Sequence, residues 1–107
     1  MSAPTQIHIA TPLMACQEEL ARFFAIHPDP SLHKRATKAL RLMASSEMPL
    51  AGKPQGWAAG AIYAVANLDR PACGIPGLLN SEVTKFFGVS METIRRRAAR
   101  VVSGISV

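Results

Sequence analysis

Apolar residues recur at steps of three and four along most of the chain, which is the periodicity of amphipathic helices rather than of strands. The first such run predicts a helix from Thr11-Pro12 to about Ala25. Threonine followed by proline is typical of a helix start, because the hydroxyl caps the first turn and proline needs no hydrogen-bond acceptor there. Its apolar face consists of Leu13, Cys16, Leu20, Phe23 and Phe24.

Two further helices are predicted by the same pattern. One opens at Asp29-Pro30 and has an apolar face formed by Leu32, Ala36, Ala39, Leu40 and Met43. The other opens at Lys53-Pro54 and has Trp57, Ala58, Ala61, Ile62, Val65 and Leu68 on one face. Small residues dominate this third helix, and Gly60 costs helix stability unless a neighbour needs the space. We therefore expect the third helix to be central, buried and closely crossed.

The segment from Asn80 to Arg97 has the pattern of a helix-turn-helix. Asn80 or Ser81 is expected to cap a short helix whose Val83, Phe86 and Phe87 point inward. Gly88 then supplies the backbone freedom for a turn, and Ser90 caps the last helix. The sequence thus predicts a helix-turn-helix at about residues 80–102.

The last helix is predicted to have one apolar and one basic face. Met91, Ile94, Ala98, Val101 and Val102 fall on one side. A helix buried on one face and rich in arginine on the other suits the major groove of DNA. Arg96 is the foremost candidate for a base contact, and the full set of candidate DNA-binding residues here is Ser90, Glu92, Thr93, Arg95, Arg96, Arg97 and Arg100. The alternative is an amphipathic helix whose arginines only face solvent.

A second group of basic residues lies on the predicted second helix. Lys34, Arg35, Lys38 and Arg41 fall off its apolar face and form an exposed strip, of which the first three are candidate DNA-binding residues. Such a strip is compatible with contacts to DNA phosphates and equally with an ordinary solvated face.

Length and composition limit the organisation of the chain. Its 107 residues, 49% hydrophobic and 18% charged, suit a single helical domain at residues 11–107 after a flexible arm at residues 1–10. The net charge of +5 favours a polyanionic partner. No signal peptide or membrane-spanning run is recognisable, and Cys16 and Cys73 form no close pair, so we expect a reduced, cytoplasmic protein.

No catalytic or metal-binding pattern stands out. His8, His27 and His33 belong to no recognised motif, and the chain has no phosphate-binding glycine loop. A zinc site built from Cys16, His27, His33 and Cys73 would have irregular spacing, unlike the paired ligands of structural zinc sites. We expect no enzymatic activity, no cofactor and no metal.

Two blocks of sequence resemble a known family. Pro54-Gln-Gly-Trp-Ala-Ala-Gly-Ala-Ile-Tyr63 resembles the Pro-x-x-Val-Ala-Ala-Ala-Ala-Ile-Tyr signature of the cyclin-like repeats in transcription factor IIB. Glu82-Val83, Gly88-Val89 and Thr93-Ile94-Arg95 resemble the Glu-Ile, Gly-Val and Thr-Ile-Arg positions of the same repeat. The chain is also similar to uncharacterised bacterial proteins that contain one such domain. Ala98 and Thr84 depart from the pattern, and the chain has one repeat and no zinc ribbon.

The resemblance implies an all-α, five-helix, cyclin-box-like bundle that ends in a helix-turn-helix. It implies a DNA-binding role in transcription regulation, with double-stranded DNA as partner and a protein of the transcription machinery as a further candidate. The alternative is a protein-interaction module without DNA contact, since cyclin-like domains also bind proteins in the grooves between their helices. A homodimer through Phe23, Phe24 and Ile26 would supply a second DNA-binding copy, and a monomer that buries these residues is the competing expectation.

Overall fold

The computed structural model describes residues 11–46, 50–68 and 74–105. The expected N-terminal arm and Cys73 lie outside these residues. The described part is helical and contains no strand, and its helices are α1 (Pro12–Ile26), α2 (Pro30–Ala44), α3 (Pro54–Ala66), α4 (Asn80–Phe87) and α5 (Met91–Ile105). None of them is long and apolar enough to cross a membrane.

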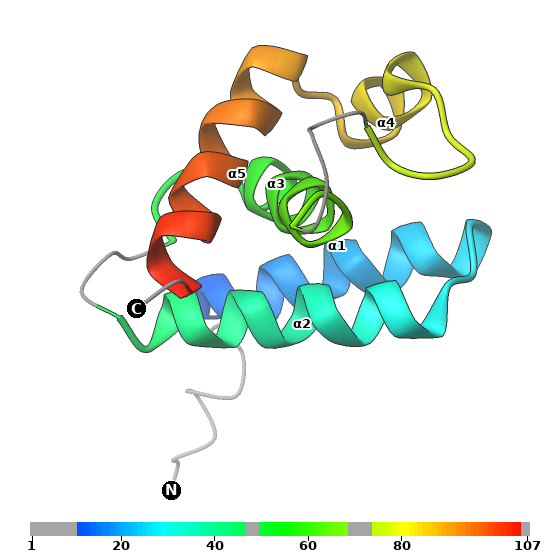
Figure 1. Cartoon of the computed structure of the whole chain (residues 1–107). Helices are drawn as coiled ribbons and strands as arrows, with labels where there is room; N and C mark the ends of the chain where they lie inside the picture. The colour runs from blue at the N-terminus through cyan, green and yellow to red at the C-terminus, as the bar shows by residue number, and fades with distance from the viewer. Residues whose placement is uncertain (1–10, 47–49, 69–73, 106–107) are drawn as a thin grey trace, which may run out of the picture.

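Helix α3 is the centre of the bundle. It packs against each of the other four helices. In Figure 1, α1 and α2 run side by side below α3, α4 lies above it, and α5 runs down its left side to α2. Every residue from position 56 to position 65 is buried, so α3 has no solvent-facing side over most of its length. The expected central position of this helix is confirmed.

The starts of the first two helices follow the predicted chemistry. The Thr11 hydroxyl accepts a hydrogen bond from the Met14 N–H at 3.0 Å, and the Asp29 carboxylate accepts one from the Leu32 N–H at 3.1 Å. Pro12 and Pro30 occupy the first helical positions. Each cap satisfies a backbone donor that would otherwise lack a partner in the first turn.

The start of α4 differs from the prediction. Neither Asn80 nor Ser81 is the cap, because the helix already begins at Asn80 and Leu79 precedes it as the N-cap. Leucine has no side-chain acceptor. Instead, the Glu82 carboxylate reaches back and accepts the Leu79 N–H at 2.8 Å. Glutamate at the third helical position commonly makes this reciprocal bond, and its charge suits the positive end of the helix.

The connection between α4 and α5 has the predicted form. Gly88 ends α4 in the left-handed conformation with φ of +68°, which a residue with a side chain rarely adopts. Ser90 then caps α5, because its hydroxyl accepts the Thr93 N–H at 3.1 Å. The left-handed Gly88 and the Ser90 cap therefore fix where α4 ends and α5 begins.

Aromatic side chains attach α4 to α1. Phe23 stacks on Phe87 with ring centroids 5.3 Å apart and meets Phe86 edge-on at 5.4 Å. Phe23 is 1% exposed and Phe24 is 6% exposed. The idea that these two phenylalanines form an apolar surface for a second copy is therefore wrong, because α4 and the core cover them. Of that predicted surface, Ile26 alone is exposed, at 62%.

Two other expected core positions lie at the surface. Leu68 was placed on the buried face of the third helix, but α3 ends at Ala66 and Leu68 is 44% exposed. Val102 was placed on the inner face of the last helix and is 36% exposed, because it lies at the border of the α5 face that contacts α3. The remaining predicted apolar faces join one continuous core that includes Trp57, Ile62, Val65, Phe87 and Ile94, with Phe86 partly buried against it.

Close packing of α5 against α3 depends on Gly60. A methyl group at this position would lie 2.6 Å from Arg97 Cβ and 3.1 Å from the backbone nitrogen of Ala98. Both distances are shorter than van der Waals contact, and one of the two atoms belongs to the backbone of α5. The predicted close crossing at Gly60 is confirmed.

Replacement of Gly60 by alanine should therefore destabilise the protein by roughly 1–2 kcal/mol, since overpacking outweighs the gain in helix propensity. Gly56→Ala is the matched control. Its methyl group would meet Thr93 Cγ2 at an ordinary 3.4 Å, so this change should be neutral or stabilising by up to about 1 kcal/mol. Urea unfolding of both variants tests the difference, and equal stabilities would contradict the close crossing.

Candidate nucleic-acid interface

Helix α5 has a buried face and an exposed, basic face. Ile94, Ala98 and Val101 are buried against the core. With about 100° between successive residues, Arg96 lies nearly opposite this buried line. The exposed residues around it are Glu92, Arg95, Arg96, Ala99, Arg100 and Ser103. The predicted division of this helix is confirmed, apart from Val102.

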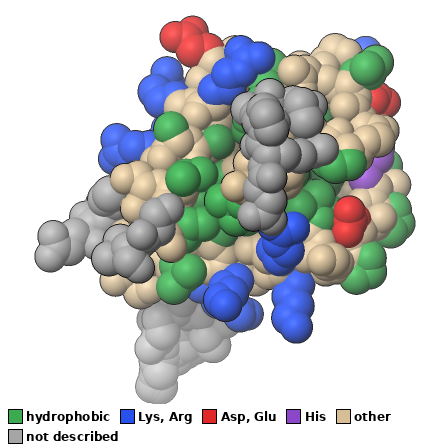
Figure 2. Space-filling view, viewed as in Figure 1, with side chains coloured by type: hydrophobic (Ala, Val, Ile, Leu, Met, Phe, Trp, Pro, Cys, Tyr) green, Lys and Arg blue, Asp and Glu red, His purple; other side chains and the backbone are tan. Residues whose placement is uncertain are grey.

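The exposed arginines of α5 form no ion pair with any described acidic residue. The one ion pair in that part of the chain joins Arg22 and Glu19 of α1 at 2.6 Å. The charges of Arg95, Arg96 and Arg100 therefore lie on one surface without an ion pair to offset them. Figure 2 shows Lys and Arg side chains along the edge of the molecule that α5 forms.

Arg97 occupies a flank of α5 and is turned toward α3. Its guanidinium lies 4.5 Å from the centre of the Trp57 ring, a cation-π contact, and its Nε is buried without a hydrogen-bond partner. Burial lowers the pKa of Arg97, and the neighbouring charges of Arg96 and Arg100 lower it further. Arg97 thus belongs partly to the α3–α5 contact and only partly to the surface.

Ser90 and Thr93 form the N-terminal end of the candidate interface. The Ser90 hydroxyl accepts the Thr93 N–H and donates to Thr93 Oγ1 at 3.2 Å. The Ser90 hydroxyl therefore uses its proton in the bond to Thr93 Oγ1 and accepts the bond that caps α5. Thr93 Oγ1 accepts this bond and retains its own proton for another acceptor.

The candidate residues on α2 lie on a separate surface. Lys34, Arg35 and Lys38 are exposed, as predicted. Arg35 also has a structural contact, because its Nη2 donates to the Val65 carbonyl oxygen at 2.7 Å, near the C-terminal end of α3. In the view of Figure 2, hydrophobic side chains lie between the Lys and Arg side chains at the lower edge, near α2, and those along α5.

No protein-family model, curated protein or solved structure matches this chain. The resemblance to the transcription factor IIB repeat therefore rests on the residues that suggest it. Those residues form the central helix α3 and the pair α4 and α5. Tyr63, the last residue of the first block, is buried in α3.

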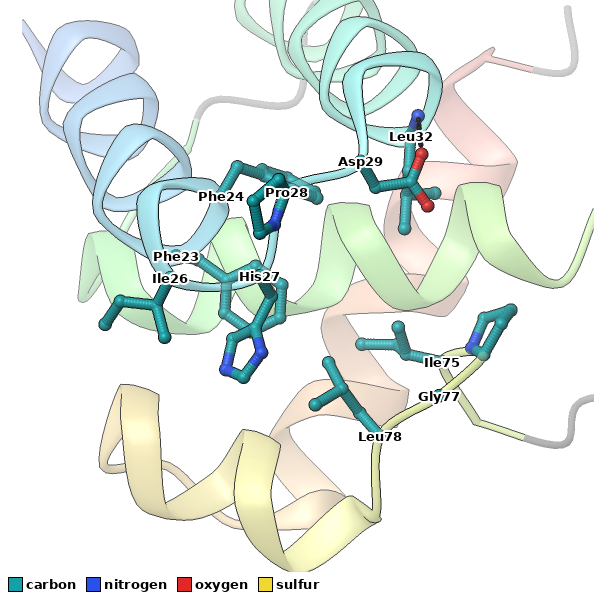
Figure 3. Close-up of a pocket in the computed structure, with 11 residues that line it drawn as sticks. Phe23, Phe24, Ile26, His27, Pro28, Asp29, Leu32, Ile75, Gly77 and Leu78 are labelled. Atoms are coloured by element: carbon teal, nitrogen blue, oxygen red, sulfur yellow. Dashed lines mark hydrogen bonds between the residues drawn. The ribbon is translucent and has the colours of Figure 1, made fainter.

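A hollow outside the basic face of α5 lies between the α1–α2 turn and the segment before α4. It has a volume of about 290 Å³. Figure 3 shows Ile75 and Leu78 facing Phe23 and His27 across it. His27 lies 4.9 Å from the Phe23 ring, and Asp29 at its rim is engaged in capping α2. Most of the residues that line the hollow are apolar, and they bring no nucleophile and base together.

Of the residues considered for metal binding, Cys16, His27 and His33 lie within the described ranges and Cys73 does not. No group of three or more histidine, cysteine or acidic residues lies close enough to hold a metal within the described ranges. His33 stacks on Phe24 at 4.7 Å. Cys16 is buried, and burial, assisted by Glu19, raises its pKa to about 11. This residue is therefore a neutral thiol near pH 7 and a poor nucleophile.

Sequence reasoning missed the contact of Arg97 with Trp57 and the position of Lys53 beside it. A signal was present in the glycines at positions 52, 56 and 60, which recur at every fourth residue. Gly56 and Gly60 lie on one face of α3, where the missing side chains leave a slot, and Gly52 continues this slot just before the helix begins. The residue that fills the slot comes from α5, and no local pattern identifies it.

Proposed function

We propose that this chain is a DNA-binding protein that uses α4 and α5 as a helix-turn-helix. The observation that supports this proposal best is the outer face of α5, where Arg95, Arg96 and Arg100 form no ion pair with a described residue and the opposite face is buried. A rigid helix with this distribution of charge suits the major groove, where its arginines meet guanine edges and phosphates. The resemblance to the transcription factor IIB repeat adds a role in transcription regulation to the proposal.

The positions on α5 suggest a division of roles. Arg96 lies at the middle of the exposed face, so we assign it the contact with base edges. Glu92 and Thr93 precede it by one turn and face the same groove. Arg95 and Arg100 lie to either side and are suited to phosphates on the two walls of the groove. Lys34, Arg35 and Lys38 are assigned phosphate contacts only, because they belong to α2 and not to the helix that we propose enters the groove.

A second candidate function is a protein-interaction module. The hollow of Figure 3 favours it, because Ile26 lines this hollow and is exposed. Leu79, at the start of α4, is exposed as well. Exposed apolar side chains around a groove are typical of sites that bind a partner protein. Such a partner would bind with little dependence on salt, whereas DNA binding depends on it strongly. Neither function requires catalysis, and we propose a non-enzymatic role.

DNA binding by α5 should be strongly salt-dependent. Several arginine contacts with phosphates would give a slope of about −3 to −5 when the logarithm of the binding constant is plotted against the logarithm of salt concentration. Fluorescence anisotropy with a labelled duplex between low and physiological salt measures this slope. A slope near zero, or no binding at low salt, would contradict the proposal and favour the protein-interaction module.

Replacing Arg96 should affect specificity as well as affinity. Arg96→Ala should weaken binding to a preferred sequence by about 1–3 kcal/mol and reduce the preference for it. Lys34→Ala is the matched control on α2 and should weaken all duplexes alike. A selected-sequence pool compared with a random duplex distinguishes the two effects. Equal, sequence-independent losses from both changes would remove the base-reading role of Arg96.

Self-association through α1 should be absent or weak. Two of the three residues suggested for a dimer surface, Phe23 and Phe24, are buried within the chain. We expect sedimentation at micromolar concentration to give a single species near the monomer mass of 11.5 kDa. A stable dimer that Ile26→Glu dissociates would instead show that the exposed part of this surface is sufficient.

A further inference from the structure

A cleft of about 350 Å³ lies beside the N-terminal half of α5, between the start of α3 and the turn that joins α4 to α5. Its volume is about ten times the roughly 30 Å³ that one molecule of liquid water occupies. Among its lining residues are Lys53, Gly88, Ser90, Thr93, Arg96 and Arg97. We call it the basic cleft, since three of these residues are cationic and no described residue that lines it is acidic.

Arg97 is held in the wall of the basic cleft by Gly56 and Gly60 of α3 and by Gly52, which precedes this helix. Methyl groups added to Gly60, Gly56 and Gly52 would lie 2.6 Å from its Cβ, 3.7 Å from its Nε and 2.7 Å from its Nη2, respectively. The side chain therefore extends along α3 toward Lys53, with its flat face on Trp57. This placement fixes a guanidinium whose Nε has no partner and whose charge no described carboxylate neutralises.

The remaining walls of the basic cleft favour an anion as well. The N-cap residues of α3 and α5, Lys53 and Ser90, both line it, so the positive ends of two helices face the same space. The Thr93 hydroxyl retains a proton to donate, as described above. Mutual repulsion of three cations in one cleft is unfavourable, and a bound anion would offset it.

We propose that the basic cleft binds a phosphate group, with Lys53 and Arg97 as its main ligands, and that DNA supplies this phosphate from its backbone. The assignment to DNA rests on the proposed function. The basic cleft lies on the Thr93 and Arg97 flank of α5, beside the exposed face whose centre is Arg96. A phosphate bound there would fix the position of α5 along one wall of the major groove. Guanidinium groups that are already held in place lose little entropy when they bind phosphate.

Inorganic phosphate titrated into the full chain tests the cleft without DNA. The fluorescence of Trp57, the one tryptophan in the sequence, is a direct readout because Arg97 lies on its ring. We expect a saturable change that sodium chloride of equal ionic strength does not produce. Lys53→Gln should weaken phosphate binding by about tenfold, as loss of a hydrogen bond to a charged group does. Lys85 is exposed in the last turn of α4 and does not line the basic cleft, so Lys85→Gln removes the same charge and should leave phosphate binding unchanged.

Duplex DNA identifies the source of the phosphate. If it is the DNA backbone, inorganic phosphate should compete with the duplex, and Lys53→Gln should reduce the salt slope by about 1. Saturable phosphate binding with an unchanged slope would overturn the assignment to DNA and show a site for a free phosphate compound. If phosphate binding is not saturable and Lys53→Gln leaves the salt slope unchanged, the proposal that the basic cleft binds phosphate is wrong. DNA binding that still depends on Arg96 would then leave the proposed function intact, whereas no binding to any duplex would reject that function separately.

Discussion

The contact between α3 and α5 is the constraint on which the surface of this protein depends. Gly60 lets the backbone of α5 approach α3 so closely that a single methyl group would not fit. Ile94, Ala98 and Val101 are buried in the core on this side of α5. Since a helix is rigid, fixing this face also fixes the opposite one. The directions of Arg95, Arg96 and Arg100 are thus consequences of packing in the core.

The position of α4 depends on a different interaction. Stacking of Phe87 on Phe23 and the edge contact of Phe86 hold this short helix against α1. A helix of eight residues is unstable alone, so its packing rather than its propensity keeps it folded. Gly88 and the Ser90 cap then set the angle at which α5 leaves it. The aromatic cluster and the α3–α5 contact together determine the geometry of the helix pair that we propose as the DNA-binding unit.

The same packing gives individual basic residues different properties. Arg96 is free on the surface, while Arg97, the next residue, lies on Trp57 within a slot that glycines create. Arg35 on α2 makes a hydrogen bond to the backbone at the end of α3 and so contributes to the fold as well as to surface charge. Net charge alone would treat these residues as equivalent. Their burial and partners distinguish them: the side chain of Arg96 is exposed, whereas packing on Trp57 fixes the side chain of Arg97.

The helices and their inner faces followed from the sequence, because caps, prolines and apolar periodicity act locally. Thr11, Asp29 and Ser90 each cap a helix within three residues of themselves, and the exposed face of α5 follows from the 3.6-residue repeat. The sequence did not determine that α4 covers Phe23, that Arg97 fills the slot above Gly56, or that Lys53 lies beside Arg97. These contacts join residues far apart in the chain. Their geometry depends on how closely whole helices approach one another, which only the packed tertiary structure decides.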